Sequence, residues 1–594
     1  MPYDNSTMRS NGEMSSEIEY GSDLAIEILK ALNIKFVALN PGASFRGLQD
    51  SLVNNVHDGP EIILCCHEEI AVAMAHGYAK ATGKPMAVML HDIVGLQHAT
   101  MAIFNAWCDR VPVIILGGGG PMDTTKRRPG IDWVHTALVQ GNLVRDFVKW
   151  DDQPYGIADI PDSILRAYRV ATMAPQGPVY VCLDSDIQES RVGGQITLPV
   201  VEQFAISAKL FPEPEALNQA ASWLVAAKSP VILADRMGCV PEAVSKLVEL
   251  AEMLAIPVID LGARFNFPNT HPMDMTGLQQ SILPQADLIL ALDVEDLYGA
   301  LHSLDHHTKE EVSLLQPQTK IIDISLRDIS IKSWSTDFQR LHKADLSIPA
   351  TGGVAVYPLT ELCRNLVKGA DHARLQQRRA ALKKQRQSAR KQWLEEALKT
   401  SSAQPIALAW LAHQIGESIK GEDWVLANGR LDGWPRRLWD WQQPHQYLGH
   451  SGGAGLGYCM GAALGVALAN KGSKRLCVNI QPDGDFLFTP QALWTAAHHR
   501  IPLLTIMHNN RSYNNTVGHA RAVAKARCRN EENRWIGTAL KEPAVDFSSL
   551  ARSFGVYAEG PIESPEEIGP ALKRAIAVVK EKQLPALVDV ITAE

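Results

Sequence analysis

Two polar turns within residues 481–515 carry the residue types that bind a small divalent cation. Asp483 and Asn510 each follow a short apolar run, and a helical pattern lies between the two runs. Parallel strands joined by a helix bring the turns that follow them to the same edge of a sheet. A carboxylate, an amide oxygen and a backbone carbonyl are ligands that Mg²⁺ takes alongside phosphate oxygens. Gly484 lets a phosphate approach the backbone. The stretch predicts a metal and phosphate site, with an ordinary βαβ unit as the alternative.

Glu68 and His91 are the candidate proton-transfer residues near the other end of the chain. Each comes directly after an apolar run that predicts a buried strand. A carboxylate at a strand end with apolar surroundings has an environment that raises its pKa, which suits acid–base chemistry. A histidine exchanges protons near neutral pH. The alternative is structural: a helix dipole also stabilises a carboxylate at its N-terminus, and a lone histidine often only packs.

Length and composition limit what the chain is. Its 594 residues exceed one hydrophobic core and suggest three domains. With 46% hydrophobic residues, 21% charged residues and a net charge of −8, it has the composition of a globular protein, and the acidic total argues against nucleic acid as a partner. No apolar run is long enough for a membrane span, and the polar first 16 residues are no secretory signal. Nine scattered cysteines suggest a reducing compartment, hence a cytoplasmic protein.

Alternating strand and helix patterns predict an α/β fold of three consecutive domains with mainly parallel sheets. The predicted order is a disordered tail over 1–19, domains over 20–190, 194–368 and 405–594, and a linker helix over 371–400. Expected strands cover 36–39, 62–66, 86–90, 111–116, 231–234, 257–259, 288–292, 321–324, 424–427, 477–480, 501–507 and 586–590. Charged and amide residues throughout the linker make it a solvated helix in preference to a nucleic-acid site.

Three stretches resemble the thiamine diphosphate enzymes that include pyruvate decarboxylase, acetolactate synthase and benzoylformate decarboxylase. Asp483 and Asn510 are 510 − 483 = 27 positions apart, which is the spacing of that superfamily's metal and diphosphate motif. HEEIAVAMAHGYAKATGKP, residues 67–85, looks like its pyrimidine-domain motif, in which the catalytic glutamate follows a histidine. MLHDIVGLQHATMAIFNAWCDRVPVIIL, residues 89–116, is similar to benzoylformate decarboxylase around an active-site histidine. The resemblance extends from Tyr20 to the C-terminus.

The resemblance implies a role for each matching residue. Asp483, the side chain of Asn510 and the carbonyl of Ser512 would hold Mg²⁺, and Glu68 and His91 would be catalytic. In GHSGGAGLGYCMGAALG, residues 449–465, Leu456 would bend the cofactor and the carbonyl of Ala454 would accept from its aminopyrimidine. The complete implied set of cofactor-binding residues is Glu68, Gly429, Arg430, Ala454, Leu456, Asp483, Gly484, Asp485, Asn510, Ser512 and Tyr513.

The sequence also departs from the family pattern. Pro482 replaces a usual glycine, and Asp485 adds a second carboxylate beside the diphosphate. Ala43 stands where benzoylformate decarboxylase has a serine hydroxyl, and its second active-site histidine would fall near Tyr298. This shortage of polar groups favours carboligation over the release of a free aldehyde.

The resemblance therefore implies an enzyme that uses thiamine diphosphate and Mg²⁺. It would decarboxylate a small 2-oxo acid and transfer the acyl anion to a proton or to a second carbonyl compound. The family builds its sites between two subunits, which implies a homodimer or homotetramer. Some members bind FAD or ADP in the central domain, but nothing here indicates such a site. A C–C lyase or hydrolase of 2-hydroxy or diketo substrates, an oxidase with FAD and a non-catalytic binding protein remain as alternatives.

Overall fold

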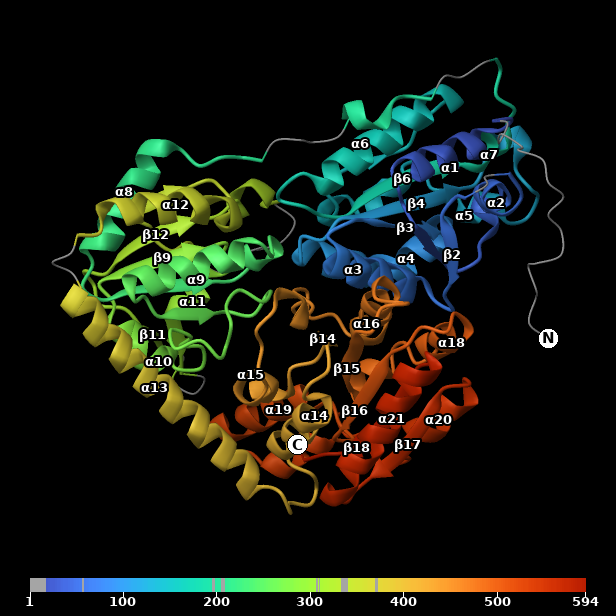
Figure 1. The fold of residues 1–594 in the computed structure, drawn as a ribbon. Helices are drawn as coiled ribbons and strands as arrows, with labels where there is room; N and C mark the ends of the chain where they lie inside the picture. Colours follow the sequence, from blue (N-terminus) through green and yellow to red (C-terminus); the bar gives the residue numbers. More distant parts are fainter. Residues whose placement is uncertain are drawn as a thin grey trace.

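The computed structural model describes residues 18–55, 58–194, 198–204, 209–305, 308, 310–332, 340–368 and 372–593. The predicted tail over 1–19 falls almost wholly outside these residues. Three α/β units follow one another along the chain, coloured blue to cyan, green, and orange to red in Figure 1. Each unit has a sheet of parallel strands, so the predicted fold class is confirmed.

The first unit has a six-stranded sheet in the order β2-β1-β3-β4-β6-β5. Its strands are β1 (Phe36–Leu39), β2 (Glu61–Leu64), β3 (Met86–Leu90), β4 (Val113–Gly119), β5 (Asp151–Asp152) and β6 (Val179–Asp184). Its helices are α1 (Gly21–Ala31), α2 (Arg46–Asp50), α3 (Glu68–Thr82), α4 (Asp92–Cys108), α5 (Asp132–His135), α6 (Ile160–Thr172) and α7 (Ser185–Glu189). Every residue of β3 and β4 is buried, as expected for parallel strands that helices cover on both faces.

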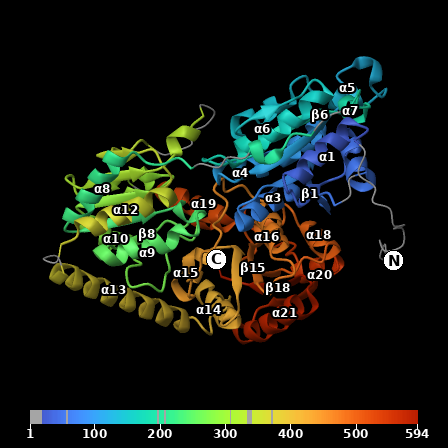
Figure 2. The same cartoon turned by 45° about the horizontal axis from the view of Figure 1, so that its top comes forward.

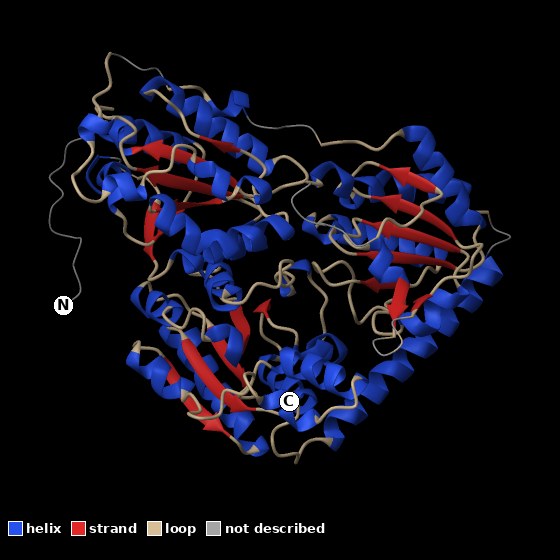
Figure 3. Cartoon of the chain, turned by 180° about the vertical axis from the view of Figure 1, so that it is seen from behind, coloured by secondary structure: helices blue, strands red, loops and turns tan. Residues whose placement is uncertain are grey.

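The second unit has the sheet β13-β12-β9-β7-β8 and a small β10-β11 hairpin. The strands are β7 (Pro230–Ala234), β8 (Val258–Asp260), β9 (Leu288–Leu292), β10 (His302–Leu304), β11 (Glu311–Ser313), β12 (Lys320–Ile324) and β13 (Leu346–Ile348). The helices are α8 (Pro214–Ala226), α9 (Ala243–Leu254), α10 (Gln279–Ile282), α11 (Leu297–Leu301) and α12 (Gly352–Leu366). Helix α13 (His372–Lys399) then runs along the outside from the second unit to the third, as Figure 3 shows from behind.

The third unit has the sheet β14-β15-β16-β18-β17. Its strands are β14 (Trp424–Asn428), β15 (Leu476–Pro482), β16 (Leu504–Asn509), β17 (Tyr557–Ile562) and β18 (Ala586–Ile591). Its helices are α14 (Leu408–Ile419), α15 (Trp434–Leu438), α16 (Tyr458–Ala469), α17 (Asp483–Phe486), α18 (Ala492–His498), α19 (Asn514–Ala526), α20 (Phe547–Ser553) and α21 (Ile568–Lys582). No helix among the described residues is long and apolar enough to cross a membrane.

Helices α3 and α16 join the first unit to the third, and they lie side by side in Figures 1 and 2. Three glycines allow this close packing. A Cβ at Gly77 would overlap the carbonyl of Ala462, and one at Gly465 would overlap the carbonyl of Met74. Gly461 faces Ala73 in the same contact. Buried residues of both units belong to one continuous hydrophobic core, so this pair of units is packed as tightly as a single interior.

Candidate active site

Glu68 lies at the carboxyl edge of the first sheet as the first residue of α3. Its Oε1 accepts a hydrogen bond from Asn40 Nδ2 at 2.9 Å, and its Oε2 is 3.2 Å from His98 Nδ1. The helix starts at Glu68 because His67 Nδ1 accepts the Glu69 N–H at 3.1 Å and caps it. The catalytic candidate is therefore buried and held from the turn after β1 and from α4.

His91 precedes α4 and lies beside Glu68. A Cβ at Gly95 would be 3.2 Å from Glu68 Oε1 and 3.3 Å from the His91 Cβ, so both side chains border the same glycine. The His91 Nδ1 is 2.9 Å from Ser44 Oγ and 3.2 Å from Asp92 Oδ2. Burial lowers the pKa of His91, and the Asp92 carboxylate only partly opposes this. Together these residues place several proton-exchanging groups at one edge of the sheet.

Five residues of this edge were not identified from the sequence: Asn40, Ser44, Asp92, His98 and His135. His135 Nδ1 lies 3.3 Å from the same Asp92 oxygen that faces His91. Asp92 and His98 are in the stretch that resembles benzoylformate decarboxylase, but His135 lies in the loop after β4, where no pattern pointed to it. We call Asn40, Ser44, Glu68, His91, Asp92, His98 and His135 the first-sheet cluster.

Asp483 and Asn510 meet at the carboxyl edge of the third sheet. The Ser512 backbone N–H lies 3.1 Å from Asp483 Oδ2 and 3.1 Å from Asn510 Oδ1, and the Ser512 hydroxyl donates to Asn510 Oδ1 at 2.9 Å. The Gly484 N–H donates to the other Asp483 oxygen at 2.9 Å. Burial raises the pKa of Asp483 to about 6. No cationic side chain in the described chain forms an ion pair with Asp483, so these residues, the third-sheet cluster, have hard oxygens and an unbalanced negative charge.

Asp485 has a different environment from Asp483. Its two oxygens accept hydrogen bonds from the Gly457 N–H at 2.9 Å and from Gln481 Nε2 at 2.8 Å. These bonds fix the turn that precedes α16. Glu69 approaches the same turn from the first unit, since a Cβ at Gly457 would be 2.7 Å from Glu69 Oε1. That oxygen is buried without a hydrogen-bond partner among the described residues, and burial followed by the charge of Asp485 raises the pKa of Glu69 to about 7.

The remaining predicted residues surround the third-sheet cluster less directly. Tyr513 covers Gly484, where a Cβ would be 2.7 Å from the ring. Gly429 has φ +114°, which only glycine adopts readily. Leu456 is partly exposed after Ala454 in the loop before α16. Arg430 instead lines, together with Gly429, a cavity of about 280 Å³ that reaches the second unit and α13. No hydrogen bond or ion pair in the described part of the chain joins it to Asp483.

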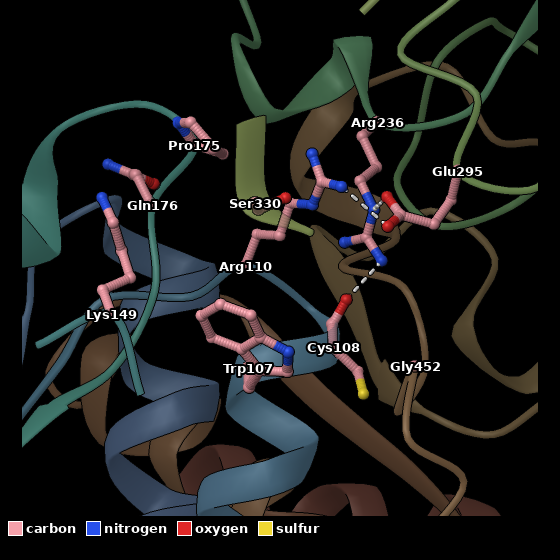
Figure 4. A pocket seen from close by; sticks show the side chains of 10 residues that line it. All are labelled: Trp107, Cys108, Arg110, Lys149, Pro175, Gln176, Arg236, Glu295, Ser330 and Gly452. Atoms are coloured by element: carbon pink, nitrogen blue, oxygen red, sulfur yellow. Dashed lines mark hydrogen bonds and ion pairs between the residues drawn. The ribbon is translucent and has the colours of Figure 1, made fainter. Parts of the chain in front are cut away.

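A second cavity, of about 120 Å³, lies between the first and second units (Figure 4). Arg110 and Arg236 line it, and Glu295 pairs with both at 2.8 and 2.9 Å. Arg236 also donates to the carbonyls of Cys108 and Asp109. Because these cations already have partners, we assign the cavity a structural role between the units.

The two clusters do not touch within one chain: no hydrogen bond or ion pair among the described residues joins them. Exposed apolar side chains border both. Trp133 and Leu138, beside His135, are 67% and 78% exposed, and Phe488 and Ile536, near the third-sheet cluster, are 51% and 79% exposed. One chain therefore presents the two clusters separately, each beside exposed apolar side chains.

A buried carboxylate paired with His98, and a separate anionic turn with glycines, are features of a cofactor-dependent α/β enzyme. The chain belongs to the thiamine pyrophosphate (thiamine diphosphate) enzymes: residues 20–142, 217–348 and 427–590 match the N-terminal TPP binding domain, the central domain and the C-terminal TPP binding domain of that family. It is accordingly an enzyme of the decarboxylase and acetolactate synthase-like class.

Full-length relatives agree with this assignment. Benzoylformate decarboxylase of Pseudomonas aeruginosa is 24% identical over 587 residues, covering 95% of this chain and 97% of the relative. A probable acetolactate synthase large subunit of Methanocaldococcus jannaschii is 25% identical over 601 residues, covering 96% and 92%. The solved structure of a 4-hydroxybenzoylformate decarboxylase from Rhodococcus jostii RHA1 superposes with a TM-score of 0.75 at 21% identity, over 97% of this chain and 99% of that one. The structural likeness shows that the fold is shared.

The residues present fit the family's cofactor. Asp483 and Asn510 converge on one point through Ser512, and Asp483 has no cationic partner in the described chain, as a metal site requires. Gly484, against which the Tyr513 ring packs, and Gly429, at φ +114°, form the turns beside this point.

Proposed function

We propose that this enzyme uses thiamine diphosphate and Mg²⁺ to decarboxylate a small 2-oxo acid and to transfer the acyl group to a proton or to a second carbonyl compound. The observation that supports this best is the meeting of Asp483, Asn510 and Ser512 at one sheet edge with no balancing cation among the described residues. The names of the relatives, benzoylformate decarboxylase and acetolactate synthase, point to 2-oxo acids as substrates.

Each cluster has its own task in this proposal. The bound cofactor supplies the electron sink for the loss of CO₂. Asp483 and Asn510, with the carbonyl of Ser512, hold the metal. Glu68 exchanges a proton with the aminopyrimidine, and the hydrogen bond from Asn40 keeps one of its oxygens in place. His91 moves protons at the substrate. The wedge role of Leu456 and the acceptor role of the Ala454 carbonyl are those that the family resemblance of residues 449–465 implies.

The active enzyme is a homodimer or homotetramer in this proposal, with each site shared by two chains. The support is that the two clusters are separate within one chain and that exposed apolar residues such as Trp133 and Ile536 border them. A second copy of the chain would bring the first-sheet cluster of one subunit to the third-sheet cluster of the other. The nine cysteines form no disulfide, which fits the expected cytoplasmic location.

The proposal does not include FAD. A dinucleotide binds at the carboxyl ends of parallel strands, where its phosphates need donors or positive charge. In the second unit Asp235, Asp260 and Asp293 follow β7, end β8 and follow β9. Burial raises the pKa of all three, and each accepts backbone N–H groups of its own unit. These carboxylates use the donors that a diphosphate would require.

The test is a panel of 2-oxo acids incubated with protein, thiamine diphosphate and Mg²⁺. We expect CO₂ release that depends on both cofactors, with an aldehyde or a coupled product identified by mass spectrometry. Parallel reactions with and without an aldehyde acceptor separate decarboxylation from carboligation. Cofactor binding by calorimetry without turnover of any 2-oxo acid would instead favour a C–C lyase or hydrolase, and a lack of binding would favour a non-catalytic protein.

A further inference from the structure

His91 and His135 point the same ring atom at a single carboxylate oxygen. Their Nδ1 atoms lie 3.2 and 3.3 Å from Asp92 Oδ2. The two rings meet edge to face, with centroids 5.4 Å apart and an angle of 79°. They come from different elements, the start of α4 and the end of α5, which are 135 − 91 = 44 positions apart. Asp92 is buried, and its other oxygen accepts the Val94 N–H at 3.2 Å.

This arrangement determines where each ring carries its proton. The Ser44 N–H donates to His91 Nδ1 at 3.4 Å, and the Ser44 hydroxyl lies 2.9 Å from the same atom, so His91 Nδ1 accepts and the neutral ring carries its proton on Nε2. An ionised carboxylate only accepts, so the His135 Nδ1 that faces Asp92 carries a proton. The neutral ring of His91 therefore presents an Nε2–H donor, and the neutral ring of His135 presents Nε2 as an acceptor. Neither Nε2 has a hydrogen-bond partner in the described part of the chain. Both histidines thus keep their reactive nitrogen free at the edge where Glu68 lies.

Burial lowers the pKa of His91, and the two groups nearest to His91 act on its pKa in opposite directions: the Asp92 carboxylate raises it, and the His135 ring lowers it. Glu68 and Arg128 are the further charged groups that act on it, in opposite directions. In their neutral forms, His91 then offers a proton from Nε2 and His135 can accept one there, the division of roles that two-group catalysis needs.

The segment with His135 is held by its own contacts. Arg128 donates to Asp132 Oδ1 from Nη2 at 2.7 Å and from Nε at 3.0 Å, and its backbone N–H donates to Oδ2 at 2.7 Å. The Thr136 hydroxyl donates to the Asp132 carbonyl at the end of the same short helix. Trp133 is exposed on this helix, but the aspartate of the turn is buried. His135 therefore has a defined position opposite His91.

We propose that His91, Asp92 and His135 form one acid–base unit, in which His135 is a second catalytic histidine and Asp92 positions both rings, and that this unit releases the product as a free aldehyde. The inference rests on the proposed function and names its product class. The reaction is R–CO–COO⁻ + H⁺ → R–CHO + CO₂. One ring gives a proton from Nε2 to the carbon that has lost CO₂, and the other accepts the proton that leaves oxygen as the carbonyl forms. One proton enters from water in each turnover.

The first test compares His91→Gln, His135→Gln and the double variant, with His445→Gln as the control. His445 is also paired with an aspartate, Asp423 at 3.0 Å, but it is only 34% exposed and belongs to neither cluster. Each single variant should lower aldehyde release roughly 10²-fold or more. The double variant should be about as slow as either single variant, because the rings act as a unit. CO₂ release in a single turnover and thiamine diphosphate binding should stay near wild type.

Two kinetic results would overturn the inference. Turnover by His135→Gln within about threefold of wild type would remove His135 from the chemistry, since a positioned acid or base contributes far more. A single-turnover loss of CO₂ that slows as much as aldehyde release would place the histidines before decarboxylation. Stoichiometric Zn²⁺ binding that disappears in His135→Gln would make the three residues a metal site instead.

The second test does not depend on turnover. Histidine ring signals of the ¹³C-labelled holoenzyme are followed against pH by NMR. His91 should titrate at higher pH in His135→Gln, because the His135 ring no longer lowers its pKa, and at lower pH in Asp92→Asn, while His445→Gln changes neither. A His91 titration that is unchanged in His135→Gln would refute the unit. If the wild type turns over no 2-oxo acid, the proposed function fails, and this titration still decides whether the two rings are coupled.

Discussion

The first and third units both place carboxylates at the carboxyl edge of a parallel sheet, but different groups surround these carboxylates. In the first-sheet cluster, Asp92 faces two histidines and Glu68 faces a histidine and an asparagine. In the third-sheet cluster, the oxygens of Asp483 accept only backbone N–H groups. Backbone donors orient a carboxylate without neutralising it, whereas an imidazole can take up its charge. The third unit is therefore suited to hold a cation and the first to move a proton.

The largest effect should follow from replacing Glu68, the carboxylate of the first-sheet cluster that contacts the cofactor in this proposal. Glu68→Gln keeps the Asn40 contact but cannot exchange a proton, so hydrogen–deuterium exchange at the thiazolium C2 should slow by roughly 10²–10⁴-fold. His91→Ala should leave that exchange near normal and lower turnover instead, because it acts on the substrate. Proton NMR of acid-quenched samples measures the exchange. Equal slowing by both variants would show that the division between these residues is wrong.

The next largest effect tests the third-sheet cluster. Asp483→Ala removes an oxygen that no other residue replaces, so Mg²⁺-dependent thiamine diphosphate affinity should fall by more than about 100-fold, beyond the usual cost of losing an outer partner of a metal ligand. Calorimetry with and without Mg²⁺ measures it. Asp546→Asn is the matched control, since Asp546 also accepts a backbone N–H, at 2.8 Å, but at a helix end. Unchanged affinity in Asp483→Ala would refute the metal assignment.

A smaller effect tests whether the two clusters cooperate across subunits. Glu68→Gln and Asp483→Ala chains are each inactive alone in this proposal. In a mixed dimer, one site has both clusters intact and the other has neither, so random mixing should restore about one quarter of the wild-type activity. Activity after co-refolding, with sedimentation to confirm the dimers, measures this. A fully active monomer would contradict a shared site.

The smallest effect concerns Glu69, which lies between the first and third units. Burial raises its pKa from 4.5 to about 7, so the folded protein binds more protons than the unfolded chain between these values. The free energy of unfolding should therefore fall as pH rises through this window. Glu69→Gln should remove that slope and raise Tm at pH 8 relative to wild type by roughly 2 °C. Glu581→Gln, an exposed carboxylate, is the control, and an equal slope in Glu69→Gln would exclude Glu69 as its source.

The fold followed from local patterns because parallel strands are continuous apolar runs. The strands expected at 36–39 and 86–90 are β1 and β3 with the same bounds, while β16, expected over 501–507, is Leu504–Asn509. Glu68 and Asp483 were identifiable because each lies in a motif beside a strand end. His135 was not identifiable, because it lies far from His91 in the sequence. Only the fold brings its four-residue helix next to that residue. Its presence also removes the reason for expecting carboligation, since polar groups are not scarce at this edge.

The contact between α3 and α16 has a consequence for protein engineering. Gly77 and Gly465 face backbone carbonyls, so any side chain there would push the helices apart. Neither glycine can therefore be replaced without moving the two helices. The loop that carries His135 lies at the surface and contacts the rest of the site through side chains. Mutant libraries that select for new substrates should therefore vary the residues around this loop and leave the contact between α3 and α16 unchanged.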